Sequence, residues 1–228
     1  MLYQILNGNF SIVSIIMQIL ATLFIMIIVL PFHELAHGFA AYKLGDNTAK
    51  NQGRLTFNPL HHINYIGAVC LLLVGFGWAE PVPVNPRNFK NPRRDMAIVA
   101  LAGPAANIIA AVIGVLISNI ISVCVPVSVM SQQWYSAVQF FFNAYISVNV
   151  NLAVFNLIPL PPLDGSKILG AFLPEHMYMK MLMNERMLST ILLVLLMTNI
   201  VDKIMYFPSI VLESFVYMVG SLPFLPFR

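Results

Sequence analysis

Charged side chains are scarce in this sequence of 228 residues. They make up 9% of it, and 59% of the residues are hydrophobic, whereas soluble globular domains carry roughly 25% charged residues. Neither residues 1–32 nor residues 96–163 contain a charged side chain. These runs exceed the about 20 residues that an α-helix needs to cross a bilayer. The composition therefore excludes an ordinary soluble domain and predicts an integral membrane protein.

Cysteine is scarce in this sequence, and a basic stretch at the N-terminus is absent. The two cysteines, Cys70 and Cys124, are too few and too far apart for a disulfide framework or a thiolate metal site. The N-terminus has no basic region and no small-residue cleavage site ahead of its apolar run, so we expect a retained span rather than a signal peptide. Since no nucleic-acid motif, repeat or low-complexity segment occurs, we expect no nucleic acid partner.

Helices are the expected spanning structure because lipid offers no partner for unsatisfied backbone groups. We predict an all-α polytopic membrane protein, a helical bundle of about four to five spans that forms a single membrane-embedded domain over residues 1–228. The predicted segments are a first span at 12–44 interrupted by Pro31, a cytoplasmic or re-entrant region at 46–94, a central span at 96–118, a span at 135–165, and C-terminal helices at 166–228 with candidate spans near 188–202 and 204–222.

The region between the first and central spans is the least regular. GRLTF, residues 53–57, predicts a short strand. The apolar run at 66–79 is only 14 residues long, which suits a re-entrant or hairpin segment better than a full crossing. EPVPVNPRNFKNPRRD, residues 80–95, is predicted to be non-helical because its prolines remove N–H donors and favour extended neighbours.

Lysine and arginine are unevenly distributed, and this predicts the orientation. Residues 1–42 and 96–163 contain none, whereas the segment between the first and central spans holds Lys43, Lys50, Arg54, Arg87, Lys90, Arg93 and Arg94. The positive-inside rule places that segment in the cytoplasm. We therefore expect a multi-pass protein of the cell (inner) membrane whose N-terminus is outside and whose His33 and Asp164 regions lie toward the same, cytoplasmic side.

HELAH, residues 33–37, places ionisable side chains in a predicted span. His33 and His37 share one helix face and can bind one metal ion, while Glu34 lies beside that ion. In this HExxH arrangement the metal activates a water molecule and the glutamate takes its proton. The alternative is a hydrogen-bonded cluster that packs helices, but ionisable residues within a span are costly and typically functional.

A catalytic zinc needs a third protein ligand and one open position. Asp164 is a candidate because it ends a long uncharged stretch, follows helix-breaking prolines and precedes Gly165, which permits a tight turn. Its alternative role is that of an N-cap for a helix from Ser166 onward.

At these positions the sequence resembles the site-2 proteases, a family of intramembrane zinc metalloproteases. The matching stretches cover residues 33–169 and are HELAHGFAAYKLGD, GRLTFNPLHHI, FGWAEPVPVNPRNFKNPRRD, LAGPAANI and FNLIPLPPLDGSKIL. They look most like the compact prokaryotic branch without a PDZ domain. The resemblance implies one Zn²⁺ ion bound by His33, His37 and Asp164, with Glu34 as the general base.

Three further residues match motifs of that family. Asn156 belongs to an Asn-x-x-Pro-x-x-x-x-Asp-Gly pattern and is our candidate to stabilise developing charge or hold substrate, unless it only satisfies carbonyls of a broken helix. Asn107 ends a Gly-x-x-x-Asn element and can hydrogen-bond across helices, with pure packing as the alternative. His62 matches a family histidine, but Asn64 and Tyr65 replace the usual Asp and Pro. A role for His62 toward ligand or substrate and a structural role both stay open.

These features predict hydrolysis of peptide bonds within or near transmembrane segments of membrane proteins. A helical substrate must unwind first, and we expect the backbone around Val82 and Val84 to offer unpaired groups beside which it can add as a strand. The lipid bilayer is the other expected partner, and the sequence does not indicate the oligomeric state. The alternatives are a membrane zinc carrier or sensor, an HExxH protease with a downstream glutamate ligand, and an inactive relative that serves as a membrane adaptor.

Overall fold

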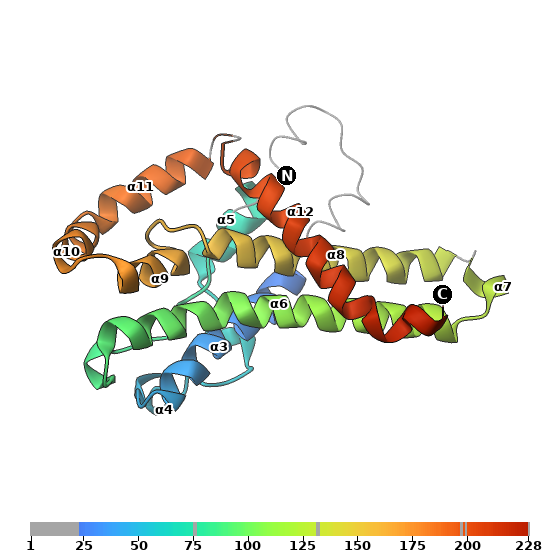
Figure 1. Cartoon of the computed structure of the whole chain (residues 1–228), viewed down its shortest axis with the longest axis horizontal. Coiled ribbons are helices and arrows are strands. Elements are labelled where there is room, and N and C mark those ends of the chain that lie inside the picture. Colours follow the sequence, from blue (N-terminus) through green and yellow to red (C-terminus); the bar gives the residue numbers. More distant parts are fainter. Residues whose placement is uncertain (1–22, 75–76, 131–132, 197, 199, 228) are drawn as a thin grey trace. The chain divides into compact units, whose positions relative to one another are not determined.

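The computed structural model describes residues 23–74, 77–130, 133–196, 198 and 200–227. Within these ranges the chain forms helices joined by turns and loops, without strands (Figure 1). Four helical segments of the described chain are long and apolar enough to cross a membrane: Ile25–Lys43, Pro92–Cys124, Trp134–Asn156 and Ile200–Phe224. The predicted all-α polytopic membrane fold is confirmed. The first third of the predicted first span, residues 12–22, lies outside the described residues.

The first described span combines a π-helical turn, η1 (Ile25–Val29), with the α-helix α3 (Leu30–Lys43). Pro31 lies in the first turn of α3. Because proline has no N–H, it leaves a carbonyl of the preceding turn without its usual helical donor, and that turn is the wider π-helix. Pro31 therefore begins a new helix, which is one of the two outcomes expected from the sequence. The chain leaves α3 through Gly45, whose positive φ of 106° suits glycine.

The chain forms two compact units, Met1–Gly103 and Pro104–Arg228. Their boundary lies inside one long helix, α6 (Pro92–Cys124), at the proline within that helix. With 33 residues, α6 is about 50 Å long. It is therefore longer than the about 30 Å hydrocarbon core that a spanning helix must cross.

Short helices connect α3 to α6 in the first unit: α4 (Thr48–Asn51), η2 (Pro59–His61), α5 (Tyr65–Val74) and η3 (Pro86–Asn88). The 10 residues of α5 extend about 15 Å, which is too short for a crossing. The expectation that residues 80–95 are non-helical was wrong in part, because these residues contain the 3₁₀ turn η3 and α6 begins at Pro92. Proline is favoured in the first turn of a helix, where its missing N–H costs nothing.

The short strand predicted at residues 53–57 was wrong. The described chain has only one isolated antiparallel bridge, between Ile63 and Ala79. The Arg54 guanidinium donates hydrogen bonds to the carbonyls of Glu80 and Pro81, at 2.8 and 3.1 Å. A side chain therefore occupies the acceptors that a β-ladder would need.

The second unit contains the C-terminal part of α6 and the remaining helices: α7 (Val127–Met130), α8 (Gln133–Asn156), α9 (Asp164–Phe172), α10 (Glu175–Met183), α11 (Glu185–Leu196), α12 (Ile200–Ser221) and η4 (Leu222–Phe227). Of the two C-terminal spans expected from the sequence, the second corresponds to α12. At the position of the first, α11 has only 12 residues, which is short of a full crossing.

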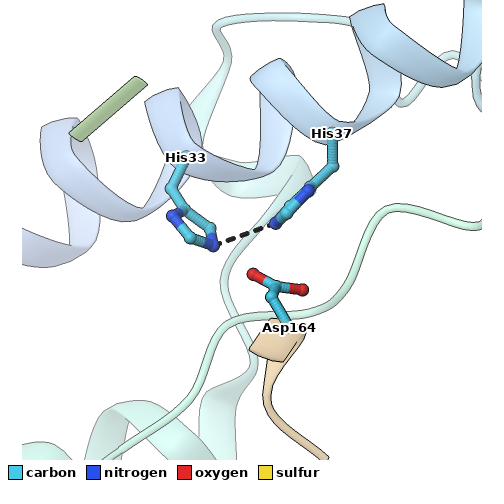
Figure 2. Close-up of side chains that lie close together, drawn as sticks. All are labelled: His33, His37 and Asp164. Atoms are coloured by element: carbon cyan, nitrogen blue, oxygen red, sulfur yellow. Dashed lines mark hydrogen bonds between the residues drawn. The ribbon is translucent and has the colours of Figure 1, made fainter. Parts of the chain in front are cut away.

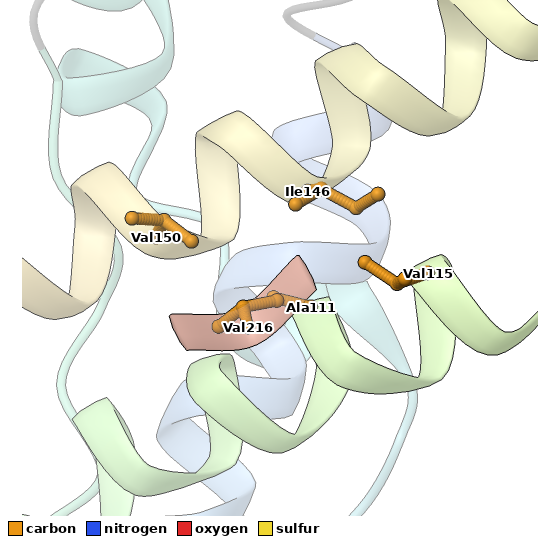
Figure 3. Packing of buried hydrophobic residues seen from close by; sticks show 5 residues of the cluster. All are labelled: Ala111, Val115, Ile146, Val150 and Val216. Carbon is orange, nitrogen blue, oxygen red and sulfur yellow. The ribbon is translucent and has the colours of Figure 1, made fainter. Parts of the chain in front are cut away.

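The core of the second unit lies between α6, α8 and α12 (Figure 3). Its buried side chains are Ala111, Val115, Ile146, Val150 and Val216. Gly220 on α12 allows this packing, because a Cβ there would lie 2.7 Å from the Cβ of Val115. Small residues that let backbones approach are characteristic of helix contacts in membranes.

Candidate metal centre

Two buried imidazoles face each other on α3. His33 and His37 are 4% and 8% exposed, and their Nε2 atoms lie 3.0 Å apart (Figure 2). The i, i+4 spacing brings the two rings onto one helix face, as the sequence predicts. Two nitrogens bound to one tetrahedral zinc at 2.0–2.1 Å would be about 3.3 Å apart. The pair therefore fits a shared metal ion with little movement.

The other ring nitrogen of His37 is held by α6. His37 Nδ1 lies 2.7 Å from the backbone carbonyl of Val99. Because a carbonyl can only accept, Nδ1 must carry the proton and donate it. In the neutral ring Nε2 then presents its lone pair toward His33, which is the tautomer that a metal ligand requires.

Gly103 provides room next to both imidazoles. A Cβ at this position of α6 would lie 2.6 Å from His33 Cε1 and would collide with His37 Nε2. No larger residue can therefore occupy this position without moving a ring. The sequence predicts the Gly-x-x-x-Asn element as a packing feature, but its spacing alone does not reveal that the glycine faces the histidines.

Glu34 is partly buried, and the backbone of a distant segment holds it. Its Oε2 accepts a hydrogen bond from the N–H of Val82 at 2.9 Å. Val82 is buried, and its Cγ1 lies 3.0 Å from where a Cβ of Gly38 on α3 would be. The expectation of an unpaired backbone donor at Val82 was therefore wrong, because the carboxylate of the predicted general base occupies that donor.

Asp164 belongs to the second unit, where it is the first residue of α9. It is 6% exposed, and its Oδ1 accepts a hydrogen bond from the Lys167 ammonium at 3.3 Å. Leu163 takes the N-cap position and no side chain caps α9, so the alternative role of Asp164 as an N-cap is not observed. Figure 2 draws the Asp164 carboxylate with the two histidine side chains.

Gly165 explains why a glycine follows this aspartate. A Cβ on Gly165 would collide with the carbonyl oxygen of Leu157 and lie 2.5 Å from that of Ile158. The chain just after α8 and the start of α9 therefore approach so closely that a side chain at position 165 does not fit.

The remaining candidates have defined contacts. Asn156 Nδ2 donates to the carbonyl of Leu152, one turn earlier in α8, at 3.0 Å. Asn107 is fully buried and its Nδ2 donates across helices to Asn149 Oδ1 at 2.9 Å. These bonds satisfy polar groups within the second unit. They do not decide between the packing and the functional roles predicted for Asn156 and Asn107.

His62 is buried in the loop region of the first unit, whereas His61 is exposed. His62 Nε2 donates to the carbonyl of Thr56 at 2.9 Å, and the backbone carbonyl of His62 accepts a hydrogen bond from the N–H of Glu80 at 2.8 Å. The amide of Asn64 donates to the Glu80 side chain at 2.9 Å. These contacts give His62 a structural role in the loop, and a role toward substrate stays a prediction.

Comparison with known proteins identifies the family. Residues 116–199 match the model of peptidase family M50. The chain is 40% identical over 181 residues to YwhC of Bacillus subtilis (strain 168), named as a candidate zinc metalloprotease, and the match covers 79% of this chain and 82% of YwhC. The chain belongs to peptidase family M50. This membership confirms the resemblance to the site-2 proteases that the motifs predict.

A second relative is Rip2 of Mycolicibacterium smegmatis, also named as a candidate zinc metalloprotease. It is 31% identical over 144 residues, which are 60% of this chain and 51% of Rip2. No solved structure matches the chain. The names of both relatives describe a zinc metalloprotease, in agreement with the zinc cofactor expected from the sequence.

Proposed function

We propose that this M50 peptidase hydrolyses peptide bonds within or near transmembrane segments of membrane proteins, as in regulated intramembrane proteolysis. The observation that carries the proposal is the pair of buried imidazoles on α3, 3.0 Å apart at Nε2. Glu34 directly follows His33 in the sequence, and all three residues lie within a helix apolar enough to cross a membrane. Ionisable groups at such depth are costly unless they serve a site. An HExxH sequence in this setting favours metal-dependent hydrolysis over helix packing.

One zinc ion would be held by His33, His37 and Asp164. Two imidazoles and one carboxylate are a donor set that catalytic zinc uses, with a fourth position left for water or substrate. Each of the three side chains is buried, and the Lys167 ammonium, which bonds to Asp164 Oδ1 at 3.3 Å, favours the ionised carboxylate that a metal ligand requires. Family membership supports zinc as the metal, while this ligand set and the general base are part of the proposal.

When bound, the zinc ion supplies Lewis acidity that activates water and polarises a carbonyl. Glu34 accepts the proton of the attacking water and then gives it to the leaving amine. The Val82 N–H fixes one oxygen of the Glu34 carboxylate, so the other oxygen is available for the proton. Asn156 is the candidate to stabilise developing charge or to hold extended substrate backbone.

A substrate helix must unwind before its backbone becomes accessible. The segment after Ala79 offers few groups for strand addition: Pro81 and Pro83 have no N–H, and the N–H groups of Val82 and Asn85 are already bonded. Val84 is therefore the position at which we propose that an unwound substrate adds. Replacing Val84 by proline should abolish cleavage while zinc binding stays intact, and unchanged turnover would contradict strand addition there.

The proposed location is the cell (inner) membrane, with the N-terminus outside and the site open to the cytoplasm. The basic residues gather between the first and second described spans, which the positive-inside rule places in the cytoplasm. Along α3, His37 and His33 lie roughly 9 and 15 Å from its end at Lys43. A site at this depth is inside the bilayer and still within reach of cytoplasmic water.

Purified protein should be tested by metal analysis and by cleavage of a panel of membrane-spanning peptides. We expect one zinc per chain in wild type and in Glu34→Gln, with cleavage by wild type alone. Zinc binding without cleavage in wild type would instead favour a carrier or sensor. Full activity of Glu34→Gln would exclude Glu34 as the general base.

A further inference from the structure

Two carboxylates of the first unit, Glu34 and Asp46, connect α3 and its C-terminal turn to residues 82–88, called here the 82–88 segment. At one end, the N–H of Val82 donates to Glu34 at 2.9 Å. At the other end, the N–H of Asn85 donates to Asp46 Oδ2 at 2.7 Å, and Asn88 Nδ2 donates to Asp46 Oδ1 at 2.6 Å. The 82–88 segment is thus bonded near the start of α3 and just beyond its end.

Asp46 is itself firmly joined to α3. Its N–H donates to the carbonyl of Ala41 at 2.9 Å, and its side chain is 0% exposed. Oδ1 also accepts the N–H of Thr48 at 3.0 Å. A buried carboxylate surrounded by donors in this way holds its neighbours in one arrangement, since losing any bond leaves a buried polar group unsatisfied.

Apolar contacts seat the segment against α3 between the two carboxylates. Val82 packs at Gly38, where a larger residue would meet it. Val84 packs against the buried cluster of Ala41, Phe89 and Val99. Val99 also supplies the carbonyl that holds His37, so the segment, α3 and the start of α6 are linked around the predicted histidine ligands.

We propose that Asp46 is a positioning residue for hydrolysis, because it fixes the 82–88 segment so that the Val82 N–H holds Glu34 in its working orientation. The inference rests on the proposed role of Glu34 as the general base. A glutamate side chain has several rotatable bonds, and misplacement of a reacting group by about 1 Å can cost roughly a hundredfold in rate. The His37 tautomer is set by Val99 instead, so zinc binding should not depend on Asp46.

The test compares Asp46→Asn with Glu80→Gln in the purified full chain. Both changes replace a carboxylate by an amide near the same segment, but the Glu80 side chain bonds to Asn64 and not to α3. We expect Asp46→Asn to lower kcat roughly ten- to hundredfold, with zinc content and KM close to wild type. Glu80→Gln should behave like wild type.

Hydrogen exchange provides a readout that does not depend on activity. Peptides covering residues 81–88 should take up deuterium faster in Asp46→Asn than in wild type or Glu80→Gln. A purely structural carboxylate would instead lower zinc content and apparent kcat in the same proportion, through loss of folded protein. If Asp46→Asn does not fold, Asn88→Ala removes a single bond to Asp46 and should show the same pattern to a smaller extent.

Swapping the carboxylate of Asp46 with the amide of Asn88 tests the hydrogen bond between these two side chains. Asn88→Asp alone places two carboxylates together and should lower kcat, whereas the double variant with Asp46→Asn restores an amide–carboxylate pair and should recover part of it. If Asp46→Asn has the kcat and the hydrogen-exchange rates of wild type while Glu34→Gln is inactive, only the positioning role of Asp46 is overturned. Activity retained in Glu34→Gln would overturn the proposed function instead.

Discussion

At the scale of single residues, the geometry of the imidazole pair depends on a missing side chain. Gly103 lies on α6 against His33 and His37, and a Cβ there would collide with His37 Nε2. The backbone carbonyl of Val99, one turn earlier on the same helix, accepts a hydrogen bond from His37 Nδ1–H. One helix therefore both orients a predicted ligand and leaves room for what that ligand binds.

Replacing Gly103 by alanine should weaken zinc binding by at least roughly tenfold, because the added methyl group would collide with His37 Nε2 and press on His33 Cε1. Competition with a chelator measures the affinity. Gly114→Ala is the matched control: it lies on the same helix, and its Cβ would press on Tyr145 at 2.9 Å, so it should reduce stability and leave zinc affinity unchanged. Equal zinc affinities for wild type and Gly103→Ala would show that α6 does not confine the metal.

The sequence predicts the imidazole pair but not what surrounds it. HELAH specifies the spacing on one helix face, and that local rule holds for His33 and His37. The contacts of Glu34 with Val82 and of His37 with Val99 join residues 48 and 62 positions apart. No periodicity in the sequence encodes such pairs, or the bonds of Asp46 with Asn85 and Asn88.

At the scale of secondary-structure elements, hydropathy predicts the spans well and the connecting region poorly. The expected span at 96–118 lies within α6. The expected span at 135–165 corresponds to α8 at its start, but α8 ends at Asn156, so the expected C-terminal bound was wrong. In contrast, GRLTF has strand-like composition but no strand partner, and Arg54 takes the neighbouring carbonyls. Hydropathy reports which residues tolerate lipid, whereas a strand exists only where another segment supplies the opposite row of hydrogen bonds.

The bond between α3 and the 82–88 segment should depend on pH through Asp46. Burial by itself raises the pKa of Asp46, but hydrogen bonds from Thr48, Asn85 and Asn88 outweigh burial and hold the pKa below its ordinary value. A carboxyl with a lowered pKa in the folded state stabilises the fold above its unfolded-state pKa, and this stabilisation is lost as the pH falls through the folded-state value.

We therefore expect Asp46→Asn to lower the free energy of unfolding by about 2 kcal/mol at neutral pH, with the difference from wild type shrinking as the pH falls below about 4. Denaturant unfolding of zinc-free protein in detergent measures this without a contribution from metal release. A difference that is constant over the whole pH range would show that the lost stability does not come from the ionised carboxylate.

At the scale of the whole molecule, the orientation in the membrane decides which compartment supplies water to the site. The basic residues predict a cytoplasmic location for residues 43–94 and an outer location for the connection that follows α6. Cys124 is the last residue of α6 and is exposed, whereas Cys70 is only partly so. The Cys124 thiol can therefore be labelled chemically to locate the predicted outer end of α6.

In a Cys70→Ala background, a membrane-impermeant maleimide added to spheroplasts with an intact inner membrane should label Cys124. The label requires that the end of α6 faces outside, as the charge distribution predicts. Labelling that appears only after the membrane is permeabilised would reverse the topology and place the site on the opposite side. The variant lacking both cysteines gives the background signal.

The zinc content of Asp164→Ala tests the central claim most directly, because that claim assigns one ion to two imidazoles of α3 and a carboxylate at the start of α9. Wild type should hold one zinc per chain, and Asp202→Ala, which removes an exposed carboxylate in the first turn of α12, should hold the same. Asp164→Ala should lose the ion and all cleavage. Wild-type zinc content and affinity in Asp164→Ala would contradict the proposed ligand set.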